Sequence, residues 1–130
     1  MAKNHILVSY LISRGTGRSS GMRVWSDGRA EIKTGAEAWK KVAQLEVGQV
    51  GSLAQVLDAS GILRLPARLA APEGVFDTPF CEWQANIEGK KVSSVVEGWS
   101  EHRSQELNLN NLMDQIYQEI SAAQMSASKP

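Results

Sequence analysis

Two strand pairs, each followed by a segment with helical periodicity, constrain the fold of this chain more than any other feature. The first pair covers residues 22–32 and precedes a helical segment over residues 47–59. The second covers residues 81–92 and precedes a helical segment over residues 107–120. Because each helix has an apolar stripe to bury, we expect both to pack on one antiparallel sheet. The predicted fold class is therefore α+β.

The second strand pair opens with the most regular alternation in the chain. Apolar Cys81, Trp83, Ala85 and Ile87 alternate with polar Glu82, Gln84, Asn86 and Glu88. This period of two predicts a strand whose apolar side chains face the core. A two-residue Gly89-Lys90 turn of type II′ puts glycine in the first position, where it is preferred. That turn pairs Ile87 with Val92, Ala85 with Ser94 and Trp83 with Val96.

The register of the first strand pair follows from the position of its charged residues. A two-residue Asp27-Gly28 loop sets apolar Val24 opposite the carboxylate of Glu31. A three-residue loop over residues 26–28 separates apolar from charged side chains, and Gly28 takes the left-handed conformation that this loop requires. We therefore predict the longer loop. It pairs Val24 with Ala30, Met22 with Ile32 and Arg23 with Glu31.

Residues 5–13 are rich in Ile, Val, Leu and Tyr, which favours a strand over a signal peptide. Ile6 and Val8 lie on one face of this strand, and Leu7 and Leu11 lie on the other. Apolar residues on both faces are typical of strands that are covered on both sides. We expect a central strand with cover on each face.

The remaining segments are less regular. Residues 36–45 fit neither period cleanly, and we interpret them as a further strand. Ser60-Gly61 ends the helical segment, and Ile62 is placed to close its C-terminal cap. Residues 65–79 contain several prolines and predict a long, stiff loop of the kind that often carries function.

These elements assemble into one domain over residues 1–120. We expect the order β-ββ-α-ββ-α, with about four to five strands in an antiparallel sheet and two helices packed on it. Residues 121–130 are small and polar, so a flexible C-terminal tail is predicted there.

Composition narrows the range of partners. The chain of 130 residues carries 14 basic and 14 acidic side chains. This balance gives no electrostatic case for nucleic acid or an anionic membrane as the main partner. No apolar stretch approaches the length of a membrane span. Cys81 is the only cysteine, which excludes an internal disulfide and fits a cytoplasmic location.

The polar residues form no pattern typical of catalysis or metal binding. The Gly-rich segment 15–21 lacks the Lys and the following helix of a phosphate-binding loop. His5 and His102 are the only histidines and lie far apart in the sequence, which disfavours a metal site. Cys81 lies on the apolar phase of its strand and is expected to be a buried core residue. We expect a non-enzymatic protein without a metal or other cofactor.

The tryptophans differ in their predicted placement. Trp83 lies on the inward phase of its strand, whereas Trp25 lies on the outward phase beside Arg23 and Arg29. An outward Trp in this setting is either half covered by arginine stems or part of a binding surface, and the pattern leaves both open. Trp39 and Trp99 are not placed by periodicity.

Three segments of the chain resemble one family. A strand followed by Ser and Gly residues, a helix leading to a Leu-Pro segment, and an Asp before the next strand occur at residues 10–21, 53–66 and 77–87. In these features the chain resembles the emfourin-like family of small bacterial proteins. Residues 13–17 read Ser-Arg-Gly-Thr-Gly, where the family has a tighter Ser-Gly-Gly-type segment. The resemblance implies inhibition of thermolysin-like zinc metalloproteases by insertion of a loop into the active-site cleft.

Together these features predict a protein-binding module whose partner is a protein, such as a metalloprotease, and not nucleic acid or a membrane. Two other interpretations use the same residues: a small-ligand-binding protein or small enzyme that uses the exposed sheet face, and an accessory subunit of a larger assembly. The expected protein contacts are Arg14, Thr16, Arg18, Arg23, Trp25, Arg29, Phe76 and Asp77.

Overall fold

The computed structural model describes residues 4–13, 19–35, 37–71 and 79–127, with the side chains of residues 101–103 and 127 left out. The strands are β1 (Ile6–Ser13), β2 (Ser19–Trp25), β3 (Arg29–Lys33), β4 (Lys40–Gln44), β5 (Arg68–Leu69), β6 (Phe80–Ile87) and β7 (Lys90–Val96). The helices are α1 (Val47–Ser60), the 3₁₀ turn η1 (Ile62–Arg64), α2 (Glu101–Glu106) and α3 (Leu109–Ala127). The α+β class predicted from the sequence is confirmed.

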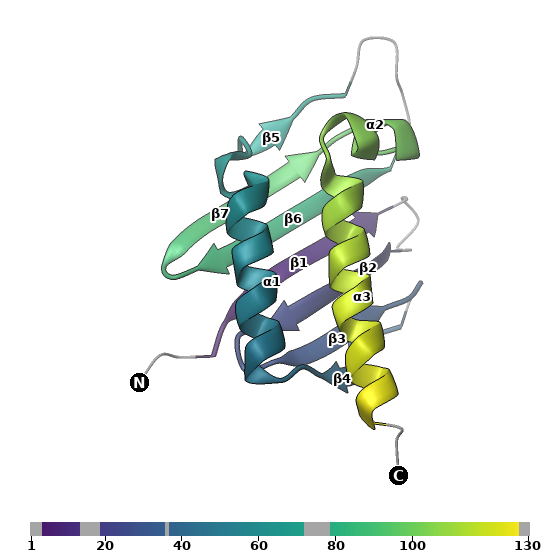
Figure 1. Cartoon of the computed structure of the whole chain (residues 1–130). Coiled ribbons are helices and arrows are strands. Elements are labelled where there is room, and N and C mark those ends of the chain that lie inside the picture. The colour runs from purple at the N-terminus through teal and green to yellow at the C-terminus, as the bar shows by residue number, and fades with distance from the viewer. Residues whose placement is uncertain (1–3, 14–18, 36, 72–78, 128–130) are drawn as a thin grey trace.

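The strands form a single sheet in the order β4-β3-β2-β1-β6-β7-β5, and α1 and α3 both cross the same face of it (Figure 1). Neighbouring strands are antiparallel except β5, which runs parallel to β7. The sheet therefore has more strands than the predicted four to five, and it is not purely antiparallel as predicted. The two-residue β5 lies inside the segment predicted to be a loop. The sequence did not predict this strand because two residues are too few to show a periodic pattern.

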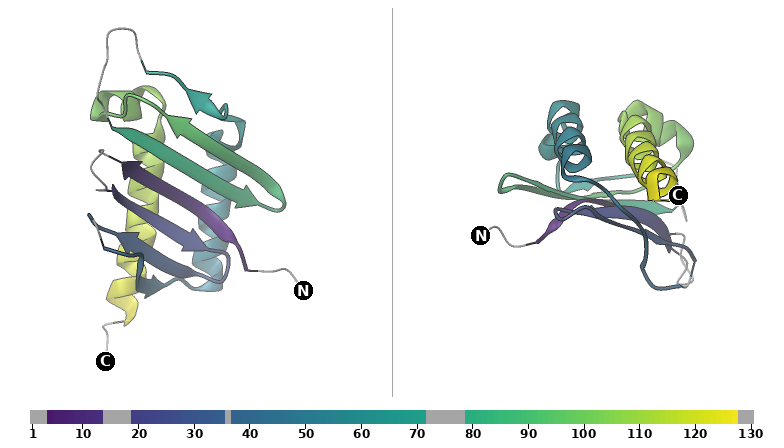
Figure 2. Two further views of the ribbon diagram at one scale, coloured as in Figure 1. Left: turned by 180° about the vertical axis from the view of Figure 1, so that it is seen from behind. Right: turned by 60° about the horizontal axis from the view of Figure 1, so that its bottom comes forward.

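The strand β1 is central, as predicted, but it is covered on one face only. Both long helices lie on the same side of the sheet, as the end-on view in Figure 2 shows. A register shift between Ile6 and Val8 marks a bulge, and it lets Leu7 and Val8 both enter the core. The bulge, together with half-buried Leu11 on the open face, explains why the sequence of β1 looks apolar on both sides.

The predicted register of the first hairpin is confirmed. Val24 pairs with Ala30, Met22 with Ile32 and Arg23 with Glu31. The Gly28 backbone has a φ of 94°, the left-handed conformation that the three-residue loop requires. Segregation of apolar and charged side chains was therefore enough to fix this pairing.

The predicted register of the second hairpin was wrong by two residues. Ala85 pairs with Val92, Trp83 with Ser94 and Cys81 with Val96. The turn residues are Glu88 and Gly89, with φ values of 52° and 83°, so both are left-handed, as in the type I′ turns that match strand twist. A shift of two residues leaves every side chain on its own face, so the alternation could not distinguish the two registers.

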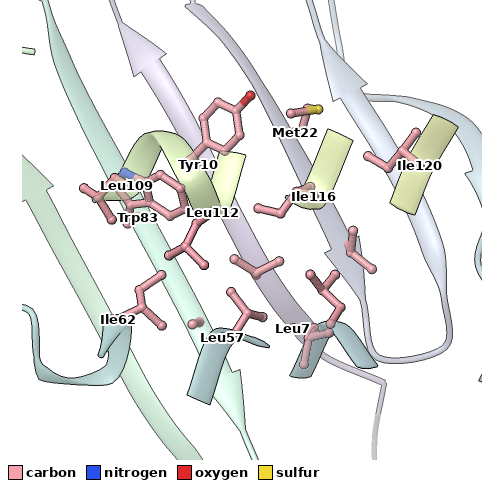
Figure 3. Packing of buried hydrophobic residues seen from close by; sticks show 14 of the residues in the cluster. Leu7, Tyr10, Met22, Leu57, Ile62, Trp83, Leu109, Leu112, Ile116 and Ile120 are labelled. Atoms are coloured by element: carbon pink, nitrogen blue, oxygen red, sulfur yellow. The ribbon is translucent and has the colours of Figure 1, made fainter. Parts of the chain in front are cut away.

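The core lies between the sheet and the helices α1 and α3. Figure 3 shows Tyr10, Met22 and Trp83 from the sheet meeting Leu112, Ile116 and Ile120 of α3 and Leu57 of α1. The Trp83 and Cys81 side chains are both 0% exposed, which confirms their predicted place in the core. Burial raises the pKa of the Cys81 thiol to about 12, so this thiol stays protonated and unreactive at neutral pH.

The ends of the helices follow local rules. The Gln49 side chain accepts a hydrogen bond from the backbone N–H of Glu46 at the start of α1. At its other end Gly61 is left-handed and Ile62 is buried, so the predicted C-terminal cap is confirmed. The last helix continues to Ala127 rather than ending near residue 120, and Ala123 is buried. No helix in the described ranges is long and apolar enough to cross a membrane.

We predict that Gly21→Ala destabilises the protein, because a Cβ on Gly21 would overlap the carbonyl oxygen of Tyr10 on β1. The free energy of unfolding should fall by about 1 to 3 kcal/mol, the usual cost of overpacking. The control is Gly51→Ala in α1, whose Cβ would meet open space and should stabilise the helix by about 0.5 to 1 kcal/mol. Urea denaturation measures both; equal stability of the two variants would contradict the described contact between β1 and β2.

Candidate functional site

One face of the sheet carries no helix, and it is called the open face below. The view from behind in Figure 2 looks directly onto it. Cross-strand partners project from the same face of a sheet, so the register defines which side chains lie there. One row crosses six strands from β4 to β7. Its members are Lys41, Glu31, Arg23, Ser9, Gln84 and Ser93.

Within this row Glu31 organises a group of five residues, the Glu31 cluster, made of Arg23, Trp25, Arg29, Glu31 and Trp39. Its carboxylate Oε1 accepts hydrogen bonds from Arg23 Nε at 2.6 Å and from Trp25 Nε1 at 2.5 Å. Its Oε2 lies 3.2 Å from Arg29 Nη2. Glu31 is only 3% exposed, although it faces away from the helices. The covering atoms therefore belong to its own partners.

Arg23 is held by two tryptophans as well as by the carboxylate. The guanidinium carbon lies 4.1 Å from the ring centroid of Trp39 and 5.4 Å from that of Trp25. These distances are typical of cation–π contacts, which also stack the flat guanidinium against the ring. Arg23 is thereby fixed in one orientation on the open face.

The charge state of Glu31 reflects opposing effects. Burial by itself would raise the pKa of the carboxyl group. Hydrogen bonds from Arg23 and Trp25, together with the charges of Arg23 and Arg29, outweigh burial and lower that pKa below its ordinary value. The carboxylate is therefore ionised at neutral pH, and its ionisation contributes to stability.

Two shallow hollows lie beside the cluster on the open face. One, of about 330 Å³, is lined by residues that include Ile6, Trp25, Gln84 and Asn86. The other, of about 160 Å³, is lined by Ile6, Ser9, Leu11, Arg23, Trp39, Glu82 and Gln84. Because Ile6 and Gln84 line both, the hollows are neighbours on the open face. The larger hollow is mainly apolar, whereas the smaller one mixes apolar Ile6, Leu11 and Trp39 with polar and charged side chains. Protein-binding surfaces combine apolar and polar groups in the same way.

Of the residues expected to contact a partner, Arg23, Trp25 and Arg29 come together in the Glu31 cluster. The outward placement of Trp25 is confirmed, and the guanidinium group of Arg23, not its aliphatic stem, is the part that lies over the ring. The predicted contacts Arg14, Thr16, Arg18, Phe76 and Asp77 lie outside the described residues.

The described residues that flank those segments lie at the end of β1 away from Trp25. Ser13 pairs with Ser19 on one side and with Phe80 on the other, whereas Trp25 pairs with Ile6. The described residues next to segments 14–18 and 72–78 therefore lie at one end of β1 and β6. Trp25 of the Glu31 cluster lies at the other end of β1.

Glu31 and Trp39 were missing from the expected contacts. The sequence already predicts Glu31 opposite Arg23. That pairing, with Arg29 two residues before Glu31, is the signal that could have identified this carboxylate as part of the site. Trp39 precedes β4 and is two residues from Lys41, which pairs with Glu31. Once residues 36–45 are read as a strand, that spacing places Trp39 on the open face.

In the part of the chain that the structure describes, no three His, Cys, Asp or Glu side chains are grouped so that they could hold a metal ion. The chain matches no family model, and no curated protein is significantly similar to it.

We predict that Glu31→Gln destabilises the protein by about 1 to 3 kcal/mol at neutral pH, since it removes the charge that the two arginines and Trp25 share. The folded-state pKa of Glu31 is lowered, so this stabilisation is present above the ordinary value of 4.5 and is lost as pH falls through the folded-state pKa. The stability gap between wild type and variant should therefore narrow in acid. Denaturant unfolding over a pH series measures it.

The control for this experiment is Glu82→Gln, an exposed carboxylate on the same face. It should change stability little at any pH. A gap for Glu31→Gln that stays constant down to strongly acidic pH would show that the carboxylate is not the organising charge.

Proposed function

We propose that this chain is a non-enzymatic protein-binding module that engages its partner through the open face. The Glu31 cluster is the observation that carries the proposal. It presents two tryptophans and two arginines, residue types that dominate the binding energy of protein interfaces. Because Glu31 and the stacked rings already fix Arg23, little side-chain entropy remains to be lost on binding.

The surroundings of the cluster support the same function. Ile6 and Leu11 are half-buried on the open face next to the cluster, with Ser9 between them on β1. Gln84 and Glu82 lie opposite Ser9 and Leu11 on β6. Apolar and polar side chains that alternate in this way are common in interfaces that form and dissociate. We infer that a partner would cover the hollows and the cluster together.

The more specific form of the proposal is inhibition of a thermolysin-like metalloprotease. Its support is the resemblance to the emfourin-like family and the attachment of segments 14–18 and 72–78 at neighbouring strand ends. Ser13 comes directly before segment 14–18 and Phe80 follows segment 72–78 by two residues, and these two residues are cross-strand partners. The single, buried cysteine is compatible with the cytoplasmic location that we also propose.

To test binding through the open face, the tagged protein is used to capture a partner from the source cell, and the complex is then measured with purified components by calorimetry. Trp39→Ala should weaken that complex by at least tenfold, because it removes one wall of the cluster. Tyr117→Ala is the control, since Tyr117 is 59% exposed on α3, in the helical layer. Failure to retain any partner, or equal effects of the two variants, contradicts the proposal.

For the inhibitor form, we predict that excess protein abolishes peptide cleavage by a thermolysin-like enzyme. Replacing residues 14–18 by a Gly-Ser linker of the same length should restore cleavage while urea denaturation shows a folded sheet. Unchanged protease activity at saturating protein contradicts this form and leaves the open-face proposal standing.

A further inference from the structure

The two layers of the molecule carry opposite charge. On the open face, the register places cationic side chains in excess of carboxylates. The cations are Arg23, Arg29, Lys33, Lys41 and Lys91, and the carboxylates are Glu31 and Glu82. A further ion pair between Arg68 and Glu97 adds no net charge.

The helical layer is acidic. Among the side chains of α1, α2 and α3 that the structure describes, the charged ones are Asp58, Glu106, Asp114 and Glu119. Lys40 and Lys90 project to the same side from β4 and β7, but the four carboxylates outnumber them. Among these described side chains the open face is therefore positive and the helix side is negative. Such a distribution steers an acidic partner towards the sheet and orients it before contact.

The uncompensated cations lie at both ends of the open-face row. Lys41 on β4 is at one end, and Lys91 on β7 lies two residues from Ser93 at the other. With strands about 4.8 Å apart, a row across six strands spans about 24 Å. An extended peptide of about seven residues covers that length. The half-buried Ile6 and Leu11 lie between the two ends, beside the hollows.

Resting on the protein-binding function proposed above, we propose that the open face binds an extended acidic segment of the partner protein. Carboxylates of the segment contact Lys41 and Arg29 at one end and Lys91 at the other. Apolar side chains between them enter the hollows that Ile6 helps to line. Arg29, with a side chain 51% exposed and only one carboxylate shared with Arg23, retains donors for such a contact.

Two other occupants fit the face less well. A second copy docked face to face would set the cationic rows against each other. Single-stranded nucleic acid would need free aromatic faces for base stacking, whereas Trp25 and Trp39 each have a face occupied by Arg23. A nucleic acid carries a phosphate at every nucleotide, so one phosphate would lie against Glu82, which lines the hollow of about 160 Å³.

The chain offers a matched pair of variants for the test. Lys41→Glu with Lys91→Glu reverses charge on the open face. Lys40→Glu with Lys90→Glu makes the same change on the same strands, but Lys40 pairs with Ile32 and Lys90 with Ile87, whose side chains face the helices. Both double variants have identical composition and net charge, so only the face differs. Urea denaturation establishes that both are folded.

The probe is a displayed library of short random peptides selected on the wild-type protein. We expect the enriched peptides to carry Asp or Glu on both sides of an apolar centre. Fluorescence anisotropy of these peptides should show at least tenfold weaker binding to the Lys41/Lys91 variant, near wild-type binding to the Lys40/Lys90 variant, and an affinity that falls with salt.

Enrichment of peptides without acidic residues, equal binding to the two variants, or no enrichment overturns the proposal. So does binding of labelled single-stranded RNA, or concentration-dependent self-association, that the Lys41/Lys91 variant alone abolishes. The native complex separates the two proposals. If Trp39→Ala weakens it and the Lys41/Lys91 change does not, protein binding stands and the acidic segment is rejected; if no native partner exists, protein binding itself fails.

Discussion

The structure depends on a sheet of seven strands that has helices on one face only. The covered face is apolar and packs on α1 and α3 through residues such as Trp83, Leu57 and Ile116. The other face must be stable without a second layer, and a row of exposed apolar side chains there would favour aggregation. The side chains of the open face pack on one another, and this contact reduces the apolar area that they expose.

Glu31 is the centre of that arrangement. A carboxylate that is almost fully buried is costly unless charged or polar donors surround it. Here Arg23, Arg29 and the indole N–H of Trp25 supply the donors, and the rings of Trp25 and Trp39 fix Arg23 in place. The same contacts that make the charge tolerable also order the largest side chains of the open face. A surface that is ordered for stability is thereby also prepared for recognition.

Particular residues show why some strand pairings and part of the Glu31 cluster were predictable from the sequence. Arg23 and Glu31 were paired correctly because only the three-residue loop separates apolar from charged side chains in the first hairpin. The second hairpin had no such marker, and a shift of two residues preserved its alternation, so the turn at Glu88 decided the pairing. Trp39 could not be placed without knowing where β4 begins. Its position on the open face follows from the pairing of Lys41, two residues further along, with Glu31. The two residues of β5 carry no period at all.

The separation of charge between the layers has a consequence for how a partner is selected. Net charge near zero suggests an electrostatically neutral binder, yet the field near a surface is set by the charges within about one Debye length of it, about 8 Å at physiological salt. At that range the carboxylates of α3 on the far side of the sheet are largely screened from the open face, and Arg29, Lys41 and Lys91 dominate. The apolar residues between these cations add affinity that does not depend on the charge of the partner, whereas the cations determine which segments approach. Selectivity for acidic segments and tolerance of the apolar sequence between their charges are therefore expected from the same surface.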